Sequence, residues 1–173
     1  NSNIAITYNN LGSVYWKLKQ YDNAIKYTKK SLNIYKKIYK EKHPNFALEM
    51  SNLASIFADM GDLEKARHYY MKAIEVGKSI LGLSHPETAK TIDGMGTTYL
   101  SEREIKFALP YFLLAYKLFT GNLDQKHSDV MLVYHHLQIC YQKMEILQPF
   151  EKWLSIQLGN SIQELEAKIQ NNR

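Results

Sequence analysis

The sequence is poor in three residue types, and each scarcity limits the possible folds. It has one cysteine, Cys140, which excludes an internal disulfide and a multi-cysteine metal site. Only 4 prolines and 8 glycines occur in 173 residues, too few for a sheet protein built on tight turns. No apolar run reaches the roughly 18–20 residues needed to cross a membrane, and no signal peptide is recognisable. These absences favour a helical protein in a cytoplasmic setting.

The charge is concentrated at one end of the sequence. Residues 1–45 hold nine lysines against Asp22 and Glu41, whereas the whole chain has a net charge of +5, so the remainder is slightly acidic. A basic segment can bind nucleic acid or an acidic membrane, but it can also be the solvated face of an amphipathic helix. We favour the second interpretation and expect the chain to bind neither nucleic acid nor a membrane. The basic helix over residues 22–40 is the one candidate surface for such binding. Its lysines are Lys26, Lys29, Lys30, Lys36, Lys37 and Lys40.

A repeat of 42 residues runs through the chain. The dipeptide His43-Pro44 returns as His85-Pro86, and His127-Ser128 follows at the same interval. A fixed interval of this length is typical of stacked supersecondary units. It predicts one array over residues 1–173 with units 5–46, 47–88, 89–130 and 131–172. Positions in register are Leu11/Leu53/Met95/Leu137, Tyr15/Phe57/Tyr99/Tyr141, Gly12/Ala54/Gly96, Ala24/Ala66/Ala108 and Tyr27/Tyr69/Tyr111.

Each unit predicts two helices. In the second unit apolar residues recur at helical intervals over residues 44–60 and again over 63–81. Gly61 suits the left-handed position after a helix, and Asp62 suits the next N-cap. Proline is tolerated in a first helical turn, and it keeps the preceding residue out of helical geometry. His85 therefore marks a boundary between units, and we expect no catalytic role for it.

Small and aromatic residues in register predict how the helices pack. Helix axes approach to about 8–10 Å only where the side chains at the contact are small, and the glycines and alanines in register supply such positions. We expect the aromatic at Tyr15, Phe57, Tyr99 and Tyr141 to fill the space between neighbouring helix pairs.

The segment "YNNLGSVY", residues 8–15, resembles the signature of the tetratricopeptide repeat (TPR). "MSNLASIF" and "IDGMGTTY" repeat it at residues 50–57 and 92–99. The alanine and aromatic that follow match at Ala66/Tyr70 and Ala108/Phe112, whereas the first unit has Thr28 instead of the aromatic. A 42-residue unit with His-Pro between units is similar to the long repeats of kinesin light chains. The resemblance implies an all-α fold, an α-solenoid of stacked antiparallel helix pairs forming a superhelix.

The fourth unit departs from the pattern. Gln138 stands at the small position, and Phe150 follows Pro149 where alanine is expected. This is typical of a terminal, capping unit. Ser161 and Glu164 form a capping-box pattern that predicts a separate last helix over about 161–171.

The sequence offers little chemistry. Equivalent histidines of successive two-helix units lie roughly 15–20 Å apart, too far to share one ion. His135 and His136 point about 100° apart on a helix. Hydrolase, zinc-protease and nucleotide-binding motifs are absent from the sequence, and Cys140 near these histidines lacks an orienting third group. We expect no catalytic residue, no metal, no cofactor and no enzymatic activity.

The resemblance implies a concave groove, lined by the first helix of each unit, that binds a peptide or protein segment. Asparagine amides could hydrogen-bond an extended peptide backbone, small serines and threonine leave room for it, Trp16 offers an apolar anchor, and Lys90 and Asp93 provide charge discrimination. The groove positions in register are Asn9, Asn10, Ser13, Trp16, Lys17, Ser51, Asn52, Ser55, Asp59, Lys90, Asp93, Thr97, His135 and His136.

The leading hypothesis is therefore a non-enzymatic protein-interaction module. The chain begins without methionine, so we expect a fragment of a longer protein. A regulatory or oligomerisation segment of a larger signalling protein or enzyme is the alternative. The sequence leaves the oligomeric state and the identity of the partner open.

Overall fold

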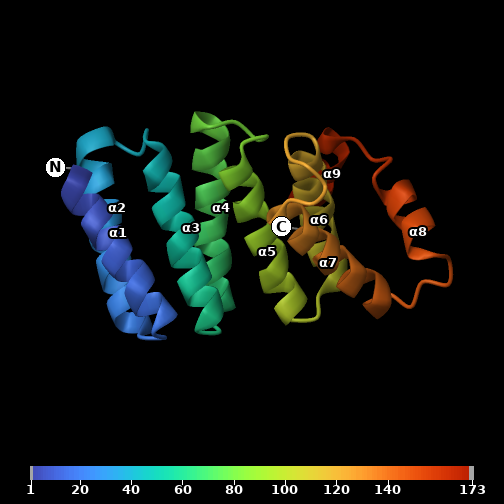
Figure 1. Cartoon of the computed structure of the whole chain (residues 1–173), viewed down its shortest axis with the longest axis horizontal. Coiled ribbons are helices and arrows are strands. Elements are labelled where there is room, and N and C mark those ends of the chain that lie inside the picture. Colours follow the sequence, from blue (N-terminus) through green and yellow to red (C-terminus); the bar gives the residue numbers. More distant parts are fainter. Residues whose placement is uncertain (1, 172–173) are drawn as a thin grey trace. The chain divides into compact units, whose positions relative to one another are not determined.

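The computed structural model describes residues 2–171, which form nine helices and no strand (Figure 1). The expected all-α fold of antiparallel helix pairs is confirmed. The helices are α1 (Ser2–Lys17), α2 (Tyr21–Tyr39), α3 (Pro44–Asp59), α4 (Leu63–Ile80), α5 (Pro86–Ser101), α6 (Ile105–Thr120), α7 (Ser128–Lys143), α8 (Phe150–Gln157) and α9 (Ile162–Asn171).

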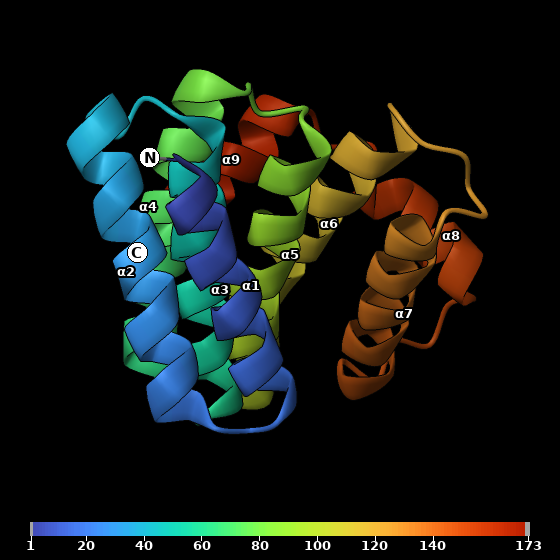
Figure 2. The same ribbon diagram turned by 60° about the vertical axis from the view of Figure 1, so that its left-hand side comes forward.

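The chain divides into two compact units, with the boundary between Gly82 and Leu83. In the first unit α1 pairs with α2 and α3 with α4, and α2 packs against α3 (Figure 2). In the second unit α5 pairs with α6, and α6 also contacts α7 and α9. The division of one array into four units remains a prediction.

The repeating histidines cap three helices. His43, His85 and His127 have extended backbones and precede α3, α5 and α7. In each, Nδ1 accepts a hydrogen bond from the backbone N–H two residues later, at 3.1, 3.2 and 3.2 Å. These side chains thus satisfy one of the N–H groups that a helix start leaves without a partner. As expected, His85 directly precedes a helix start, and its side chain is the N-cap of α5.

The helices of a pair approach at small residues. A methyl group added to Gly12 of α1 would lie 2.6 Å from Thr28 Oγ1 and 3.4 Å from the carbonyl oxygen of Ala24. One added to Gly96 of α5 would lie 2.7 Å from Cε1 of the Phe112 ring. The separations of 2.6 and 2.7 Å are both shorter than an ordinary van der Waals contact. The expected close approach at these glycines is therefore present in both units.

The aromatic residues in register pack differently from our expectation. Each ring of a first helix lies against a ring twelve residues later, on the second helix of its own pair. The expectation that they fill the space between pairs was wrong. In the first three pairs the small residues in register bring the two helices of one pair close enough for ring contact. The pairs and their centroid separations are Tyr15–Tyr27, 5.3 Å; Phe57–Tyr69, 5.5 Å; Tyr99–Tyr111, 5.6 Å; and Tyr141–Trp153, 5.4 Å.

The last two helices follow a different course. The Phe150 ring of α8 lies 5.3 Å from Tyr134 and 5.2 Å from Tyr141, so an aromatic contact replaces the alanine of the other pairs. Helix α9 packs against α6, burying Leu165 and Ile169.

Two polar contacts fix the turn between α8 and α9. Lys117 Nζ of α6 donates to the carbonyl oxygens of Leu158 and Asn160 at 2.7 and 2.6 Å. The predicted capping box is confirmed: Glu164 N–H donates to Ser161 Oγ at 3.2 Å, and Ser161 N–H donates to Glu164 Oε2 at 2.5 Å.

A carboxyl group is fully buried where α1, α2 and α3 meet. Glu49 has no exposed surface, its Oε1 lies 2.7 Å from Ser31 Oγ, and its Oε2 has no hydrogen-bond partner. The Ser31 oxygen also lies 2.8 Å from the carbonyl oxygen of Ala5. Since a hydroxyl has one hydrogen, Ser31 can donate to only one of these oxygens. If Glu49 is protonated and donates through Oε1 to Ser31 Oγ, the Ser31 hydroxyl can donate to the Ala5 carbonyl, and both close contacts are hydrogen bonds. Burial raises the pKa of Glu49 from 4.5 to about 7, and the Ser31 hydrogen bond offsets part of this.

Folding stability should therefore fall as the pH rises. Below pH 4.5 Glu49 is protonated in both states, whereas between 4.5 and about 7 it ionises only in the unfolded chain. The free energy of unfolding should therefore be lower at pH 8 than below pH 4.5, by on the order of 3 kcal/mol. In Glu49→Gln the part of the pH dependence that Glu49 causes should disappear. Urea unfolding at pH 5 and pH 8 measures the difference.

The matched control is Glu75→Gln, which changes an exposed carboxylate of α4. The control should keep the wild-type pH dependence. An equal pH dependence in wild type and Glu49→Gln would contradict the proton assigned to the buried carboxyl.

Candidate functional site

In the first unit, α1 and α3 present the candidate groove residues and join through a pair of amides. Asn52 Nδ2 of α3 donates to Asn9 Oδ1 of α1 at 3.3 Å. Both side chains are partly exposed, and the adjacent Asn10 is exposed. Ser13 and Ser51 are small and partly exposed on the same two helices. The structure thus brings together candidates from two successive repeats.

A second bond joins the same helices about two turns further along. Trp16 Nε1 donates to Asp59 Oδ2 at 2.7 Å, so this carboxylate is directed to the neighbouring repeat. Ser55 lies 2.8 Å from the hydroxyl of Tyr70, which connects α3 to α4. Lys17 is exposed at the end of α1. Trp16 therefore acts here as a hydrogen-bond donor between helices, in addition to offering its ring.

In the second unit an aspartate–histidine pair occupies the same register. His136 Nδ1 of α7 lies 2.8 Å from Asp93 Oδ1 of α5, and the His136 ring lies 4.8 Å from that of Phe112. The Asp93 residue is only 7% exposed. Its carboxylate is thus used to join α5 and α7, which leaves it little capacity for the charge discrimination that the sequence suggested.

The remaining candidates of this unit lie nearer to solvent. Lys90 Nζ lies 3.4 Å from Glu87 Oε1 and 3.3 Å from Asp129 Oδ2. Partial burial by itself would lower the pKa of Lys90, but these two carboxylates outweigh it and raise that pKa. The Thr97 hydroxyl donates to the carbonyl oxygen of Gly94 at 2.7 Å, and His135 is exposed.

The bonds between first helices share one spacing that we did not recognise in the sequence. Asn9–Asn52, Trp16–Asp59 and Asp93–His136 are each 43 residues apart, one more than the repeat. Each bond links a position in one unit to the position one residue further along in the following unit. A search of the sequence for complementary polar residues 43 positions apart would therefore have found all three bonds. Six of the candidate side chains are therefore already joined in pairs across successive repeats.

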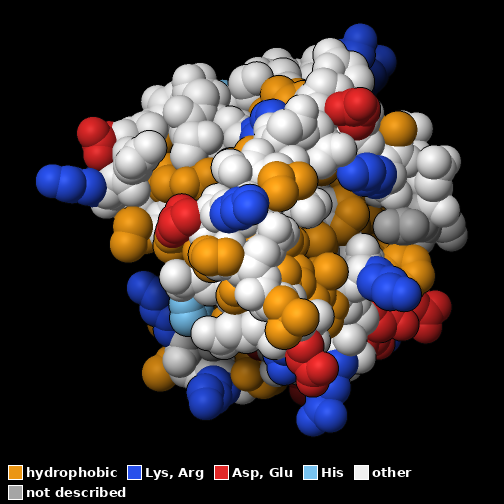
Figure 3. Space-filling view, turned by 90° about the vertical axis from the view of Figure 1, so that its right-hand side faces the viewer, with side chains coloured by type: hydrophobic (Ala, Val, Ile, Leu, Met, Phe, Trp, Pro, Cys, Tyr) orange, Lys and Arg blue, Asp and Glu red, His pale blue; other side chains and the backbone are white. Residues whose placement is uncertain are grey.

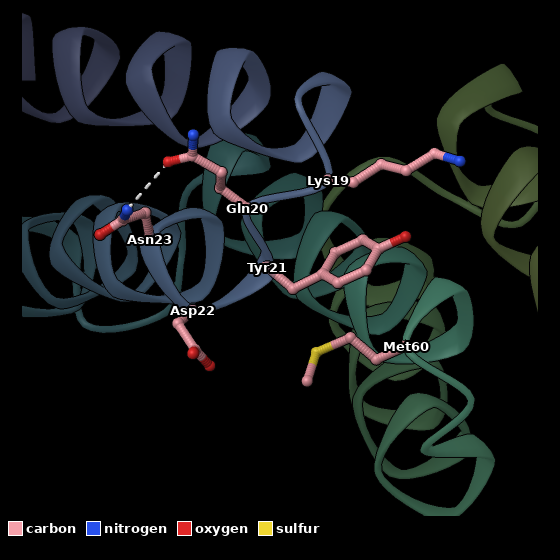
Figure 4. Close-up of a pocket in the computed structure, with 6 residues that line it drawn as sticks. All are labelled: Lys19, Gln20, Tyr21, Asp22, Asn23 and Met60. Carbon is pink, nitrogen blue, oxygen red and sulfur yellow. Dashed lines mark hydrogen bonds between the residues drawn. The ribbon is translucent and has the colours of Figure 1, made fainter.

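A shallow pocket lies beside the turn between α1 and α2. It encloses about 390 Å³ and is lined by Lys19, Gln20, Tyr21, Asp22, Asn23 and Met60 (Figure 4). Asn23 Nδ2 donates to Gln20 Oε1 at 3.2 Å on its rim. None of the groove candidates belongs to this lining.

The basic helix is exposed as its amphipathic pattern predicts. Its lysines 26, 29, 30, 36 and 37 all face solvent, while Ala24 and Tyr35 are buried. Lys36 Nζ lies 2.8 Å from Glu41 Oε1, and Lys30 Nζ lies 5.1 Å from the Tyr8 ring centre. These contacts occupy two of the lysines within the first unit.

Groups that could support other chemistry were also located. Cys140 is fully buried, and burial raises its pKa to about 12, so it carries no thiolate near neutral pH. Among residues 2–171 no group of three or more His, Cys, Asp or Glu side chains is placed to hold a metal ion. Over the same residues, no helix has both the length and the hydropathy to span a membrane.

A family model for the tetratricopeptide repeat matches residues 3–48 and 46–121, more than half of the sequence. The chain belongs to the tetratricopeptide repeat family. Repeats of this family are generally protein–protein interaction modules. No curated protein matches the sequence.

Solved structures share the fold at low sequence identity. A kinesin light chain from Podosopora anserina with nearly identical TPR-like repeats is 17% identical with a TM-score of 0.66, over 96% of this chain and 76% of its own. BtubC (BKLC) from P. vanneervenii is 19% identical with a TM-score of 0.77, over 98% and 66%. The apo form of RapI is 19% identical with a TM-score of 0.65, over 83% and 54%. The expected similarity to kinesin light chain repeats is confirmed.

The Asp93–His136 pair should stabilise the second unit. Asp93→Ala leaves His136 without its partner beside the Phe112 ring, and we expect a loss of about 1–3 kcal/mol in the free energy of unfolding. Asp93→Asn keeps a hydrogen-bonding oxygen and should lose less. Urea titration followed by circular dichroism measures both variants. Wild-type stability in Asp93→Ala would show that the pair is not structural.

Proposed function

We propose that the chain is a non-enzymatic interaction module that binds a peptide or protein segment along the first helices of its repeats. The observation that carries the proposal is the Asn9–Asn52 amide pair, which joins α1 and α3 on a partly exposed face. In that bond Asn9 accepts through Oδ1, so both of its amide hydrogens remain available. The backbone of an extended segment presents carbonyl acceptors that match such donors.

The neighbouring side chains support an extended ligand. Ser13 and Ser51 are small, so a backbone could approach the helices closely, and exposed Asn10 adds a second amide. The hydrogen bond to Asp59 fixes the Trp16 ring, which reduces the entropy lost when a ligand side chain packs against it. Lys17 favours a ligand with an acidic group near this end of α1.

The second unit offers a comparable set on its own first helices. Lys90 and His135 are exposed on α5 and α7, and Thr97 is partly exposed. The Asp93–His136 bond holds the two helices together, in the register that the Asn9–Asn52 bond occupies in the first unit. The first helices therefore supply polar groups in each of the two units.

The test uses a defined ligand. Peptides selected against the chain from a random displayed library provide the probe, and fluorescence anisotropy measures their affinity. The double variant Asn9→Ala/Asn52→Ala should weaken binding by at least about tenfold, or 1.4 kcal/mol. Thermal melts establish that the variant is folded.

The matched control is Asn33→Ala, an exposed asparagine on the second helix of the same pair. It should leave the affinity unchanged. Failure to select any peptide, or equal losses in the two variants, would contradict binding along the first helices.

A further inference from the structure

Five lysines share one exposed face of α2. Successive residues of a helix are rotated by about 100°, so these side chains fall within an arc of about 120° and extend over about 17 Å. The arc otherwise holds only Asn33 and, in the first helical turn, Asp22, which is the one acidic residue of α2. We refer to this face as the lysine stripe, which consists of Lys26, Lys29, Lys30, Lys36 and Lys37.

Contacts within the first unit neutralise little of this charge. Lys36 Nζ lies 2.8 Å from Glu41 Oε1, which makes one ion pair. Two other lysines lie over tyrosine rings, a contact that leaves the positive charge in place. Lys29 and Lys37 have no acidic partner among residues 2–171. The lysine stripe therefore presents four positive charges that no carboxylate of the described chain neutralises.

A solvated helix face does not require charges of one sign. On the corresponding face of α4, Lys72, Glu75 and Lys78 alternate, which places opposite charges three residues apart. In α2 the position of Glu75 is held by the uncharged Asn33. Basic and acidic side chains are likewise interspersed on the face of the molecule that carries α8 (Figure 3). The lysine stripe thus differs from the other polar faces of this chain in having charges of a single sign.

The single sign lowers the stability of α2 itself. Like charges three or four residues apart repel each other on a helix, and Lys26 has such neighbours in Lys29 and Lys30. The helix dipole favours lysines in the last turn, where Lys36 and Lys37 lie. It does not favour the three lysines in the middle of the helix. A binding partner with negative charge would offset this repulsion.

The repeat shows that a helix can lie on this face. Helices α5 and α7 contact α6 as α1 and α3 contact α2, but α6 also contacts α9. Lys117, on the same face of α6, donates to the carbonyl oxygens of Leu158 and Asn160 in the turn before α9. The buried residues of α6 in register with Lys26, Lys29 and Lys30 are Pro110, Leu113 and Leu114.

Stacking of successive pairs does not cover this face. Helix α2 packs against the pair that follows it, and its lysines remain exposed. Helix α4 comes after another pair, and its residues in register, His68 and Lys72, are also exposed. The face is therefore open wherever no additional helix such as α9 is present, and its openness on α2 does not depend on where the sequence begins.

We propose that the lysine stripe binds an acidic helix of a partner protein, which lies on α2 as α9 lies on α6. The lysines are three, four and seven residues apart. Carboxylates with the same spacing share one face of a helix, so several of them can meet the lysines together. Complementary charge would determine which helices bind, since the stripe offers no apolar contact. This surface is separate from the first-helix face of the proposed function.

The composition of the stripe favours a protein over other polyanions. Surfaces that bind single-stranded nucleic acid combine cations with aromatic rings on which bases stack. A helix that lies on a membrane inserts apolar side chains into the lipid. The arc of the lysine stripe contains neither an aromatic nor an apolar residue. Carboxylates on a helix need only the charges.

Fluorescence anisotropy with labelled peptides tests the proposal. Each probe is an alanine-rich peptide of about 20 residues, long enough to be helical. In the first probe all glutamates lie on one helical face, in the second the same number is distributed around the helix, and in the third glutamines replace them. The chain should bind the one-faced probe at least about tenfold more tightly than the distributed probe. The glutamine probe should not bind, and added salt should weaken the one-faced probe.

Charge reversal locates the binding surface. Lys29→Glu/Lys37→Glu should weaken the one-faced probe at least about tenfold, and neither lysine has an ion pair to lose. Lys106→Glu/Lys152→Glu changes the net charge equally at exposed lysines of the second unit and is the matched control. It should bind the probe like wild type. Circular dichroism should show unchanged helicity in both variants, since all four side chains are exposed.

Three results would overturn the proposal. Equal affinity for the one-faced and distributed probes, or equal losses in the two charge-reversal variants, would mean that the chain responds to net charge alone. Tighter binding of a single-stranded oligonucleotide, or of phosphatidylserine-containing vesicles, would assign the stripe to nucleic acid or to a membrane. Weaker binding of the one-faced probe by Asn9→Ala/Asn52→Ala would place it on the first helices. Wild-type affinity in that variant is expected, so this proposal and the proposed function can fail separately.

Discussion

The structure depends on the close approach of two helices within each pair. Gly12 and Gly96 lie so near to Thr28 and Phe112 that neither glycine has room for a methyl group. This approach brings the aromatic rings of the two helices into contact. It also leaves the outer faces of α3 and α7 open to the second helix of the preceding pair, α2 and α6 respectively. Small residues at fixed intervals therefore determine both the pair and the surface on which pairs stack.

The candidate binding face follows from that stacking. Once pairs are stacked within a unit, first helices lie near enough for side chains to bond from one repeat to the next, as Asn9–Asn52 and Asp93–His136 do. Such bonds orient polar groups before a ligand arrives, which lowers the entropy lost on binding. They also show a division of roles, because Asp93 is used within the fold while Asn9 keeps donors that a ligand could use.

The sequence predicted most of the fold because the repeat displays the same constraint several times. Helix starts at His43 and His85, the turn at Gly61 and the last helix all lie within a residue or two of expectation. Side-chain partners were harder to predict, because they depend on how two helices are rotated about their axes. This is why Trp16 was assigned as an apolar anchor without its bond to Asp59, and why the buried position of Glu49 was missed. The candidate face itself came from resemblance to a family, and its ligand remains a proposal.

The sign of one stability change tests the role of close approach most directly. A glycine in the middle of an unhindered helix gains about 1 kcal/mol of stability when it is replaced by alanine. At Gly96 the added methyl group would instead meet the buried Phe112 ring at 2.7 Å. Urea unfolding should therefore show Gly96→Ala to be less stable than wild type, by about 1–3 kcal/mol. A variant as stable as wild type, or more stable, would contradict the constraint on which this account rests.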